Sequence, residues 1–501
     1  MGRKLSAFNP IKNFKSLFSR PQSGHFKEFD GIRFFFSSYI LCFHFIYFLV
    51  WVIKREQAQL LENNFFVMIL HLGDNAVDSF FVLSGFLCYR KLLFFSEKED
   101  QEEKEEKEEK EEKETNEKKH TFSSFKFAKG LLIRRYLRLY PLIYVLSFLK
   151  ILELLPQKKL IESIPAFLLC YFGLNDLHIS INPPVGQSWS SAVELKSYAI
   201  LILFRRWLFK KKNQLRNLLI LLTTSLVVLF AVVLSVKTIL DYNVPYKLFD
   251  EEYYNFLQYD PETKELNIKM EMTEEVKIII RNTLASYYGF HIRFPNILAG
   301  FLLGYVQYKT DLAQRLKSNF LLKTILYLFG LFSFLFVYVF KYTGWFIDYV
   351  PQANQEIGVL YYTLYRLIYF NRFLSSVGFA ILLFMIINKI SIIDTIISKF
   401  LSSSIWVPFS KLSYSVYLAQ ITTVFLGILQ FRGTIGNEII QLNQFFKFLM
   451  QSVITTYIAS LVLYIFVERP FCILSPRVTG TSDQKNANLE KKDFTKEKKV
   501  K

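Results

Sequence analysis

Apolar runs long enough to cross a lipid bilayer recur along this chain from residue 31 to residue 467. A transmembrane helix needs about 20 consecutive apolar residues, which a soluble core does not require. The runs lie near 31–53, 76–95, 131–150, 190–209, 215–240, 294–309, 319–341, 361–388, 408–430 and 446–467. Hydrophobic residues make up 52% of the sequence, with 53 Phe, which argues against a soluble globular protein. The sequence therefore predicts an all-α, polytopic transmembrane helix bundle with about ten crossings.

The basic residues gather at the ends of the apolar runs, as they do at Arg205, Arg206 and 210–212. Lys and Arg are enriched on the cytoplasmic side of membrane proteins, so this pattern predicts that both termini are cytoplasmic. The short run 161–174 would break the pattern as a full crossing, and we expect it to be re-entrant or interfacial. The net charge of +18 thus reflects membrane orientation, and we expect no nucleic-acid partner.

Charge patterning divides the chain into a membrane domain and polar segments. We expect a basic cytoplasmic N-terminal segment at 1–29, a membrane domain at 30–470 and a polar cytoplasmic tail at 471–501. Within the membrane domain, 96–120 is a charged low-complexity cytoplasmic insert that repeats Glu-Glu-Lys, and 241–290 is an outer loop. An endomembrane or the plasma membrane is the favoured location. The basic, acid-poor start also fits a mitochondrial presequence, which leaves the mitochondrial inner membrane open.

Ionisable residues inside apolar helices are the strongest functional signal, because burying them in lipid costs several kcal/mol without partners. Arg33 and His44 are eleven residues apart. On an α-helix this is about 1100°, so the two lie on one stripe ~16 Å apart along the axis. Arg33 would lie near the cytoplasmic surface as an anion site, and His44 near mid-membrane as a general base. A snorkelling arginine and a histidine bonded between helices are the alternatives.

Two further segments carry candidate site residues. Arg134, Arg135 and Arg138 open the third apolar run, and their guanidinium groups suit the phosphates of a cytoplasmic donor, although plain membrane anchoring is equally open. Trp189, Glu194 and Tyr198 surround the start of the fourth run, with Glu194 and Tyr198 on one face. Glu194 could orient an imidazole, position a hydroxyl or pair with an arginine. Asp78, Ser84 and Arg293 are further polar residues at the ends or within the runs. We expect no metal site, since no cluster has ligand spacing.

Five motifs in this order resemble acyltransferase family 3 membrane proteins, including the eukaryotic branch named for nose resistance to fluoxetine. They comprise Asp30, Gly31, Arg33, Phe43 and His44; Val77 to Phe86; Arg134, Arg135, Arg138, Leu139, Tyr140 and Pro141; Trp189, Ser190, Val193, Glu194 and Tyr198; and Leu412 to Leu418 with Val467 to Phe471. The resemblance spans residues 30–470.

The resemblance implies transfer of an acyl group, commonly acetyl, from acyl-CoA to a hydroxyl of a lipid, glycan or other membrane-associated acceptor. By the resemblance His44 would be catalytic, and Arg33, Arg135 and Arg138 would serve donor binding or transfer. We also expect a catalytic role for Glu194 and donor binding by Arg134. Acyl-CoA would be a substrate, with no permanently bound cofactor. Gln420 stands where the family usually has His, and Ser191, Lys196 and Ser197 also depart from its pattern. Two rival hypotheses are a transporter and a catalytically silent member that acts as a subunit of a membrane complex. The oligomeric state is left open.

Overall fold

The computed structural model describes residues 6–20, 25–52, 64–109, 117–154, 185–239, 257–259, 266–268, 289–347, 368–435 and 441–478, with Leu61 and a few single residues between 164 and 174. Helices dominate this part of the chain. They are α2 (Pro10–Leu17), α3 (Glu28–Val52), α5 (Phe65–His71), α6 (Ala76–Glu109), α7 (Glu117–Leu154), α9 (Ser188–Leu203), α10 (Arg205–Leu208), α11 (Gln214–Ile239), α14 (Phe290–Lys309), α15 (Leu312–Ser318), α16 (Phe320–Ile347), α18 (Ile368–Asn388), α19 (Ile392–Leu401), α20 (Trp406–Ile435), α21 (Leu442–Leu463) and α22 (Arg469–Val478). Single turns are η1 (Ser6–Phe8), η2 (Leu72–Asn75), η3 (Lys211–Asn213) and the π-helical η5 (Tyr464–Glu468).

Each predicted apolar run falls on a helix where the structure describes it, so the expected helical membrane bundle is confirmed. Among the described residues, five helical segments are long and apolar enough to cross a membrane, or up to seven if two bent pairs each count as one span. The helices α7, α9 and α14 are not among these segments. Helix α9 is shorter than a span, at 16 residues, and α7 and α14 carry charged residues that lower their apolarity, the arginines from Arg134 to Arg138 and Arg293. The count of ten crossings stays a prediction.

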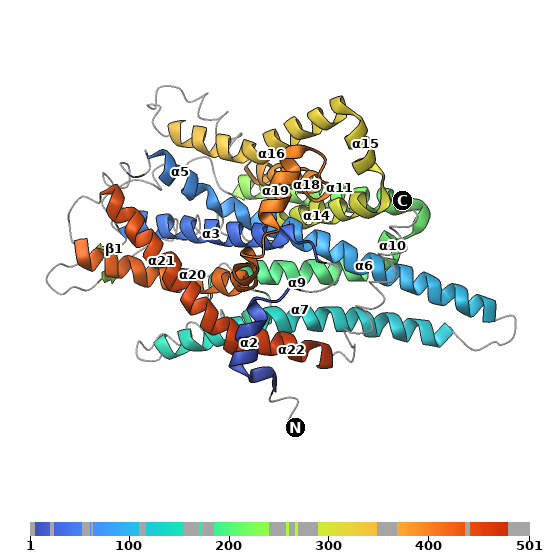
Figure 1. Cartoon of the computed structure of the whole chain (residues 1–501), viewed down its shortest axis with the longest axis horizontal. Coiled ribbons are helices and arrows are strands. Elements are labelled where there is room, and N and C mark those ends of the chain that lie inside the picture. The colour runs from blue at the N-terminus through green and yellow to red at the C-terminus, as the bar shows by residue number, and fades with distance from the viewer. Residues whose placement is uncertain are drawn as a thin grey trace.

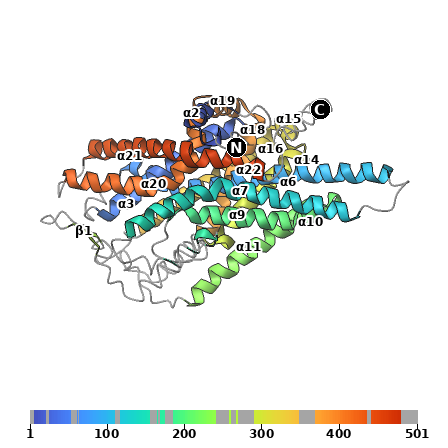
Figure 2. The ribbon, with the colours of Figure 1, turned by 90° about the horizontal axis from the view of Figure 1, so that it is seen from below.

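Two groups of packed helices make up most of the bundle. In one group α3 packs against α20, which also contacts α21, and in the other α6 packs against α14 while α18 packs against α14 and α16 (Figures 1 and 2). The backbones of α6 and α14 touch, because a Cβ on Gly85 would overlap the carbonyl of Ile297 and one on Gly300 would overlap that of Val82. These two glycines therefore allow the close packing of α6 and α14. Helices α7 and α9 lie side by side and close the remaining flank (Figure 2).

The N-terminal helix α2 runs across the direction of α3 and α20 (Figure 1). It is pinned by Asn13, whose side-chain nitrogen donates to the carbonyls of Ala7 and Ile465 at 3.0 Å each. Its opposite face exposes Ile11 and Phe18. A short amphipathic helix of this kind, with both basic and apolar residues, is typical of a membrane interface.

Two predicted polar segments lie at opposite ends of the long axis. Helices α6 and α7 extend beyond the bundle at one end, where they carry part of the charged insert 96–120 (Figures 1 and 2). The strands β1 (Leu257–Tyr259) and β2 (Leu266–Ile268) pair antiparallel at the other end, within the predicted outer loop 241–290. Most of that loop, the 161–174 run and the tail beyond 478 lie outside the described residues.

Candidate functional site

The stripe of α3 that carries Arg33 and His44 faces the interior of the bundle. Ile40 lies between the two residues on this stripe, is fully buried, and packs in one cluster with Trp189 of α9 and Val77 of α6. Arg33, at the other end of the stripe, interacts electrostatically with Arg135 and Arg138 of α7 and with Tyr198 of α9. One helix face thus connects the predicted base to the predicted cationic site.

The His44 ring is held by its own helix. Its Nδ1 lies 3.0 Å from the carbonyl oxygen of Ile40, one turn earlier. A carbonyl can only accept, so Nδ1 carries the proton in the neutral ring and Nε2 carries the lone pair. The Asp74 carboxylate also interacts electrostatically with the ring. His44 is only half-buried. The residue therefore has the tautomer that a general base requires.

Ser84, Arg135, Glu194 and Tyr198 form a cluster from α6, α7 and α9. The Glu194 carboxylate accepts a hydrogen bond from the Ser84 hydroxyl and forms an ion pair with Arg135. Arg135 Nη2 donates to the Ser84 oxygen at 3.2 Å, and its guanidinium lies 4.8 Å from the centre of the Tyr198 ring. The Tyr198 hydroxyl donates to the Ser84 carbonyl at 3.3 Å. Of the roles considered for Glu194, pairing with arginine and positioning a hydroxyl are both seen, which fixes Arg135 in place.

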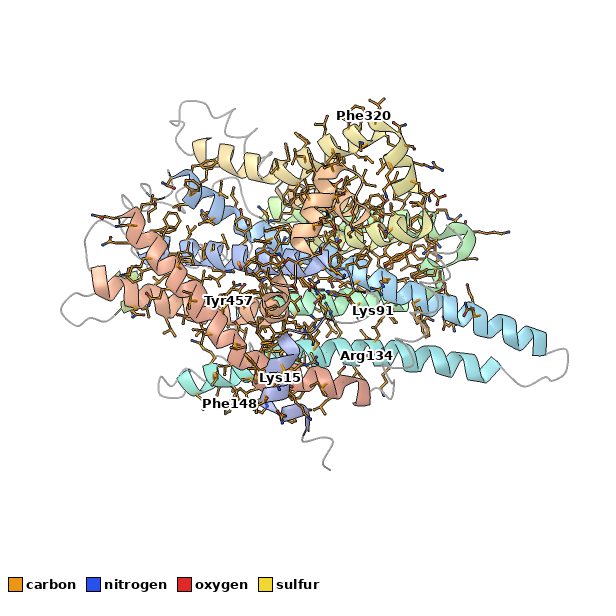
Figure 3. All side chains as sticks on the ribbon, in the orientation of Figure 1. Lys15, Lys91, Arg134, Phe148, Phe320 and Tyr457 are labelled. Atoms are coloured by element: carbon orange, nitrogen blue, oxygen red, sulfur yellow. The ribbon has the colours of Figure 1, made fainter. Side chains whose placement is uncertain are left out.

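Three cations near this cluster have no such pairing. Arg33, Lys91 and Arg138 make no hydrogen bond and no close ion pair with the described part of the chain. They are nevertheless close enough to interact electrostatically, Arg33 with Arg138 and Lys91 with both Arg138 and Arg134. Figure 3 labels Lys91 on α6 and Arg134 on α7, two helices of the same region. Like charges repel, so a cluster of this kind is stabilised by an anion.

A second polar cluster lies where η2 and α6 meet α14 and α18. Asp78 accepts hydrogen bonds from Arg293 at 2.6 Å, Asn296 at 2.7 Å and Arg372 at 3.0 Å. Arg372 also pairs with Asp74 at 2.5 Å. The Arg293 guanidinium is fully buried and lies 5.4 Å from the centre of the Trp189 ring. Two carboxylates and two guanidinium groups balance here, and Asp74 connects this network to His44.

Asp30 is positioned by the N-terminal segment. Its carboxylate accepts from Arg20 Nε at 3.1 Å and lies 3.0 Å from His25 Nε2. It interacts only electrostatically with Arg33. Asp30 thus attaches the segment before α3 to the bundle, beside the predicted anion site.

Several residues of these clusters were not chosen from the sequence as site residues. These residues are Lys91, Asp74 and Arg372. Lys91 is seven residues after Ser84, which puts it on the same face of α6 and could have pointed to it. Asp74 and Arg372 could have been found because each is a charged residue within or next to an apolar run.

The comparisons with known proteins give one match. The family model for the acyltransferase domain of acyltransferase family 3 matches residues 26–467. No curated protein and no solved structure matches the chain. The matched range contains the clusters around Arg33, Glu194 and Asp78, whereas Arg20 and His25, the partners of Asp30, precede it. The chain therefore belongs to acyltransferase family 3 and is an integral membrane acyltransferase.

Proposed function

We propose that this protein is an acyl-CoA-dependent O-acyltransferase that transfers an acetyl or other short acyl group to a hydroxyl of a membrane-associated lipid or glycan. The observation that carries the proposal is a group of cations, Arg33, Lys91 and Arg138, that have no ion pair among the described residues and lie beside Arg135, which Glu194 neutralises. The surplus positive charge calls for a polyanion. Coenzyme A carries a pyrophosphate and a ribose phosphate, and arginine binds such groups with paired hydrogen bonds.

The donor end and the reactive end of the site lie on the same helix. Arg33 is near the cations and His44 is eleven residues further along α3, about 16 Å away at 1.5 Å per residue. A donor whose phosphates lie at the cations could extend its pantetheine arm along this face toward His44. An elongated thioester fits that spacing, and a compact donor would not reach both ends.

His44 would act as the general base. Its Nε2 takes the proton of the acceptor hydroxyl as the oxygen bonds to the thioester carbonyl carbon. The carbon–sulfur bond then breaks, and the proton passes from the imidazolium to the departing coenzyme A thiolate. The products are an ester and free coenzyme A, so atoms and charges balance. The Asp74 carboxylate favours the imidazolium between the two proton transfers.

The motifs shared with the nose-resistant-to-fluoxetine branch support its placement there, and an endomembrane or the plasma membrane is the location proposed with it. The polar residues inside the bundle do not favour a transporter over an enzyme, because a substrate path and an enzyme site both require them.

The test is donor binding and acyl transfer by the full-length protein in proteoliposomes. Arg138→Ala and Lys91→Ala should each weaken binding of acetyl-CoA about tenfold, since each removes a charge-assisted contact to phosphate. Lys399→Ala, an exposed lysine on α19, is the matched control and should leave binding unchanged. Binding should also weaken with added salt.

If both variants bind acetyl-CoA as tightly as the wild type, the proposed donor site is wrong. Solute flux across the proteoliposome membrane with no dependence on acyl-CoA would decide for transport. Stable co-purification with partner proteins, together with no coenzyme A binding, would decide for a silent subunit.

A further inference from the structure

A fully buried carboxamide without partners lies in the middle of α20. Gln420 is 0% exposed, and neither its Nε2 nor its Oε1 has a hydrogen-bond partner in the described part of the chain. A polar group buried without a partner destabilises the fold, and buried amides are almost always bonded. Two unpaired atoms on one side chain therefore call for a ligand that both donates and accepts.

Gln420 lies at the level of His44. Helices α3 and α20 run parallel, with ring pairs Phe34–Phe409 at 5.1 Å and Phe48–Phe425 at 6.3 Å. His44 is four residues before the second α3 ring, and Gln420 is five residues before the second α20 ring. At 1.5 Å per residue the two side chains therefore differ by only about 1.5 Å along the helix pair.

The packing around Gln420 places it toward α3. Val416 and Val424, one turn before and one turn after Gln420, belong to one buried cluster with Leu41 and Phe45 of α3 and with residues of α21. Phe45 follows His44 in the chain. The unpaired carboxamide thus lies in an apolar setting next to the helix segment that carries the proposed base.

A second amide with an unpaired nitrogen lies directly before helix α9. Gln187 is 3% exposed and its Nε2 has no partner in the described residues. The preceding Gly186 approaches α20 so closely that a Cβ there would lie 3.2 Å from the Ile421 side chain, which is next to Gln420. Gln187 and Gln420 therefore supply two donors and one acceptor near the same level of the bundle.

We infer that Gln420, with Gln187, binds the acceptor, and that the acceptor presents a neutral vicinal diol on an apolar tail. The inference rests on the proposed function and adds the acceptor class to it. The reacting hydroxyl donates to His44 Nε2 while its oxygen accepts from Gln420 Nε2. The second hydroxyl donates to Gln420 Oε1 and accepts from Gln187 Nε2. The apolar residues around Gln420 suit a hydrocarbon tail, and no charged side chain of the binding set calls for an ionic head.

The experiment compares acceptors that differ only in the second hydroxyl. The full-length protein in proteoliposomes is given acetyl-CoA with a 1-monoacylglycerol, with a primary alcohol of matched chain length, or with free glycerol. The wild type should prefer the monoacylglycerol over the alcohol at least tenfold in kcat/KM, because the alcohol leaves buried amide atoms unpaired. Glycerol should be the poorest acceptor if the apolar tail contributes. Equal rates for glycerol and monoacylglycerol would show that the acceptor is a soluble polyol. That result would contradict the inference that the acceptor carries an apolar tail.

Gln420→Met removes both amide atoms at similar volume. It should lower the preference for the diol about tenfold while leaving acetyl-CoA binding unchanged. Its thermal unfolding midpoint should stay level or rise, because an unpaired buried amide is lost. Gln187→Met should lower the same preference to a smaller degree. Gln430→Met, an exposed amide on the same helix, is the matched control and should change nothing.

The outcomes separate this inference from the proposed function. If acetyl transfer occurs but the wild type does not discriminate diol from alcohol, the diol inference fails and the enzyme stands. The inference also fails if Gln420→Met slows both acceptors equally and lowers the unfolding midpoint, since the amide then has a structural role. If no acceptor is acetylated and acetyl-CoA does not bind, the proposed function fails and the inference fails with it.

Discussion

The buried charge network on α6, α14 and α18 allows a quantitative prediction about stability. Asp78→Asn removes a carboxylate that accepts from Arg293 at 2.6 Å and from Arg372 at 3.0 Å, and it leaves two guanidinium groups facing Asp74 alone. Arg293→Met removes the opposite charge and leaves two carboxylates facing Arg372. Either change leaves one net charge uncompensated at a site where every side chain is at most 7% exposed.

An uncompensated buried charge destabilises a fold by roughly 3–5 kcal/mol. Each single variant should lower the free energy of unfolding by about that amount. The double variant Asp78→Asn with Arg293→Met restores the balance of one carboxylate and one guanidinium. It should therefore be less destabilised than the sum of the singles, with a coupling of about 1–3 kcal/mol.

The assay is reversible unfolding in mixed detergent micelles, followed by tryptophan fluorescence for the wild type, both singles and the double. The exposed pair Lys309–Glu97, at 2.6 Å, is the matched control, and breaking it should cost less than about 1 kcal/mol. A double variant whose destabilisation equals the sum of the singles would refute the reasoning, because the charges would then not be coupled.

The remaining predictions concern the site and its surroundings. Glu194→Gln should lower kcat at least tenfold without weakening acetyl-CoA binding, because Arg135 loses the carboxylate that positions it while the cationic charge is kept; weaker donor binding would contradict this. Gly85→Ala should lower the free energy of unfolding by about 1–3 kcal/mol through overlap with Ile297, whereas Gly427→Ala, which meets only the Ser452 side chain, should cost less; equal losses would argue against backbone contact. Replacing Glu102–Lys113 with Gly and Ser should leave acetyl transfer within about twofold, since mutations remote from a site usually act independently; a loss of activity would give the insert a role.

The helices themselves were predictable because lipid permits few backbone conformations. Every apolar run became helical where it is described, since a lone strand would leave backbone groups unpaired in the membrane. Bends were less predictable. The bend of 90° between α18 and α19 is fixed by a capping box in which Ser391 and Asp394 exchange hydrogen bonds, a short local signal beside a long apolar run.

The site was predictable where helical spacing alone decides which residues share a face. Arg33 with His44, and Glu194 with Tyr198, are such pairs. Ile40, between Arg33 and His44, is buried in the bundle, and Glu194 and Tyr198 both contact Ser84. Contacts between distant helices were not predictable, because one sequence does not state which helices pack together. The approach of Asp78 to Arg372 and of Gln420 to α3 depends on that packing.

The measurement that tests the account most directly is single-turnover acetyl transfer by His44→Ala in proteoliposomes, with acetyl-CoA binding measured on the same sample. Removing a general base should slow transfer by about 10²–10⁴-fold, while the cations around Arg138 keep donor affinity unchanged. His71→Ala, the matched histidine on α5, should transfer at the wild-type rate. Full-rate transfer by His44→Ala would contradict the central claim that the imidazole on the inward stripe of α3 takes the acceptor proton.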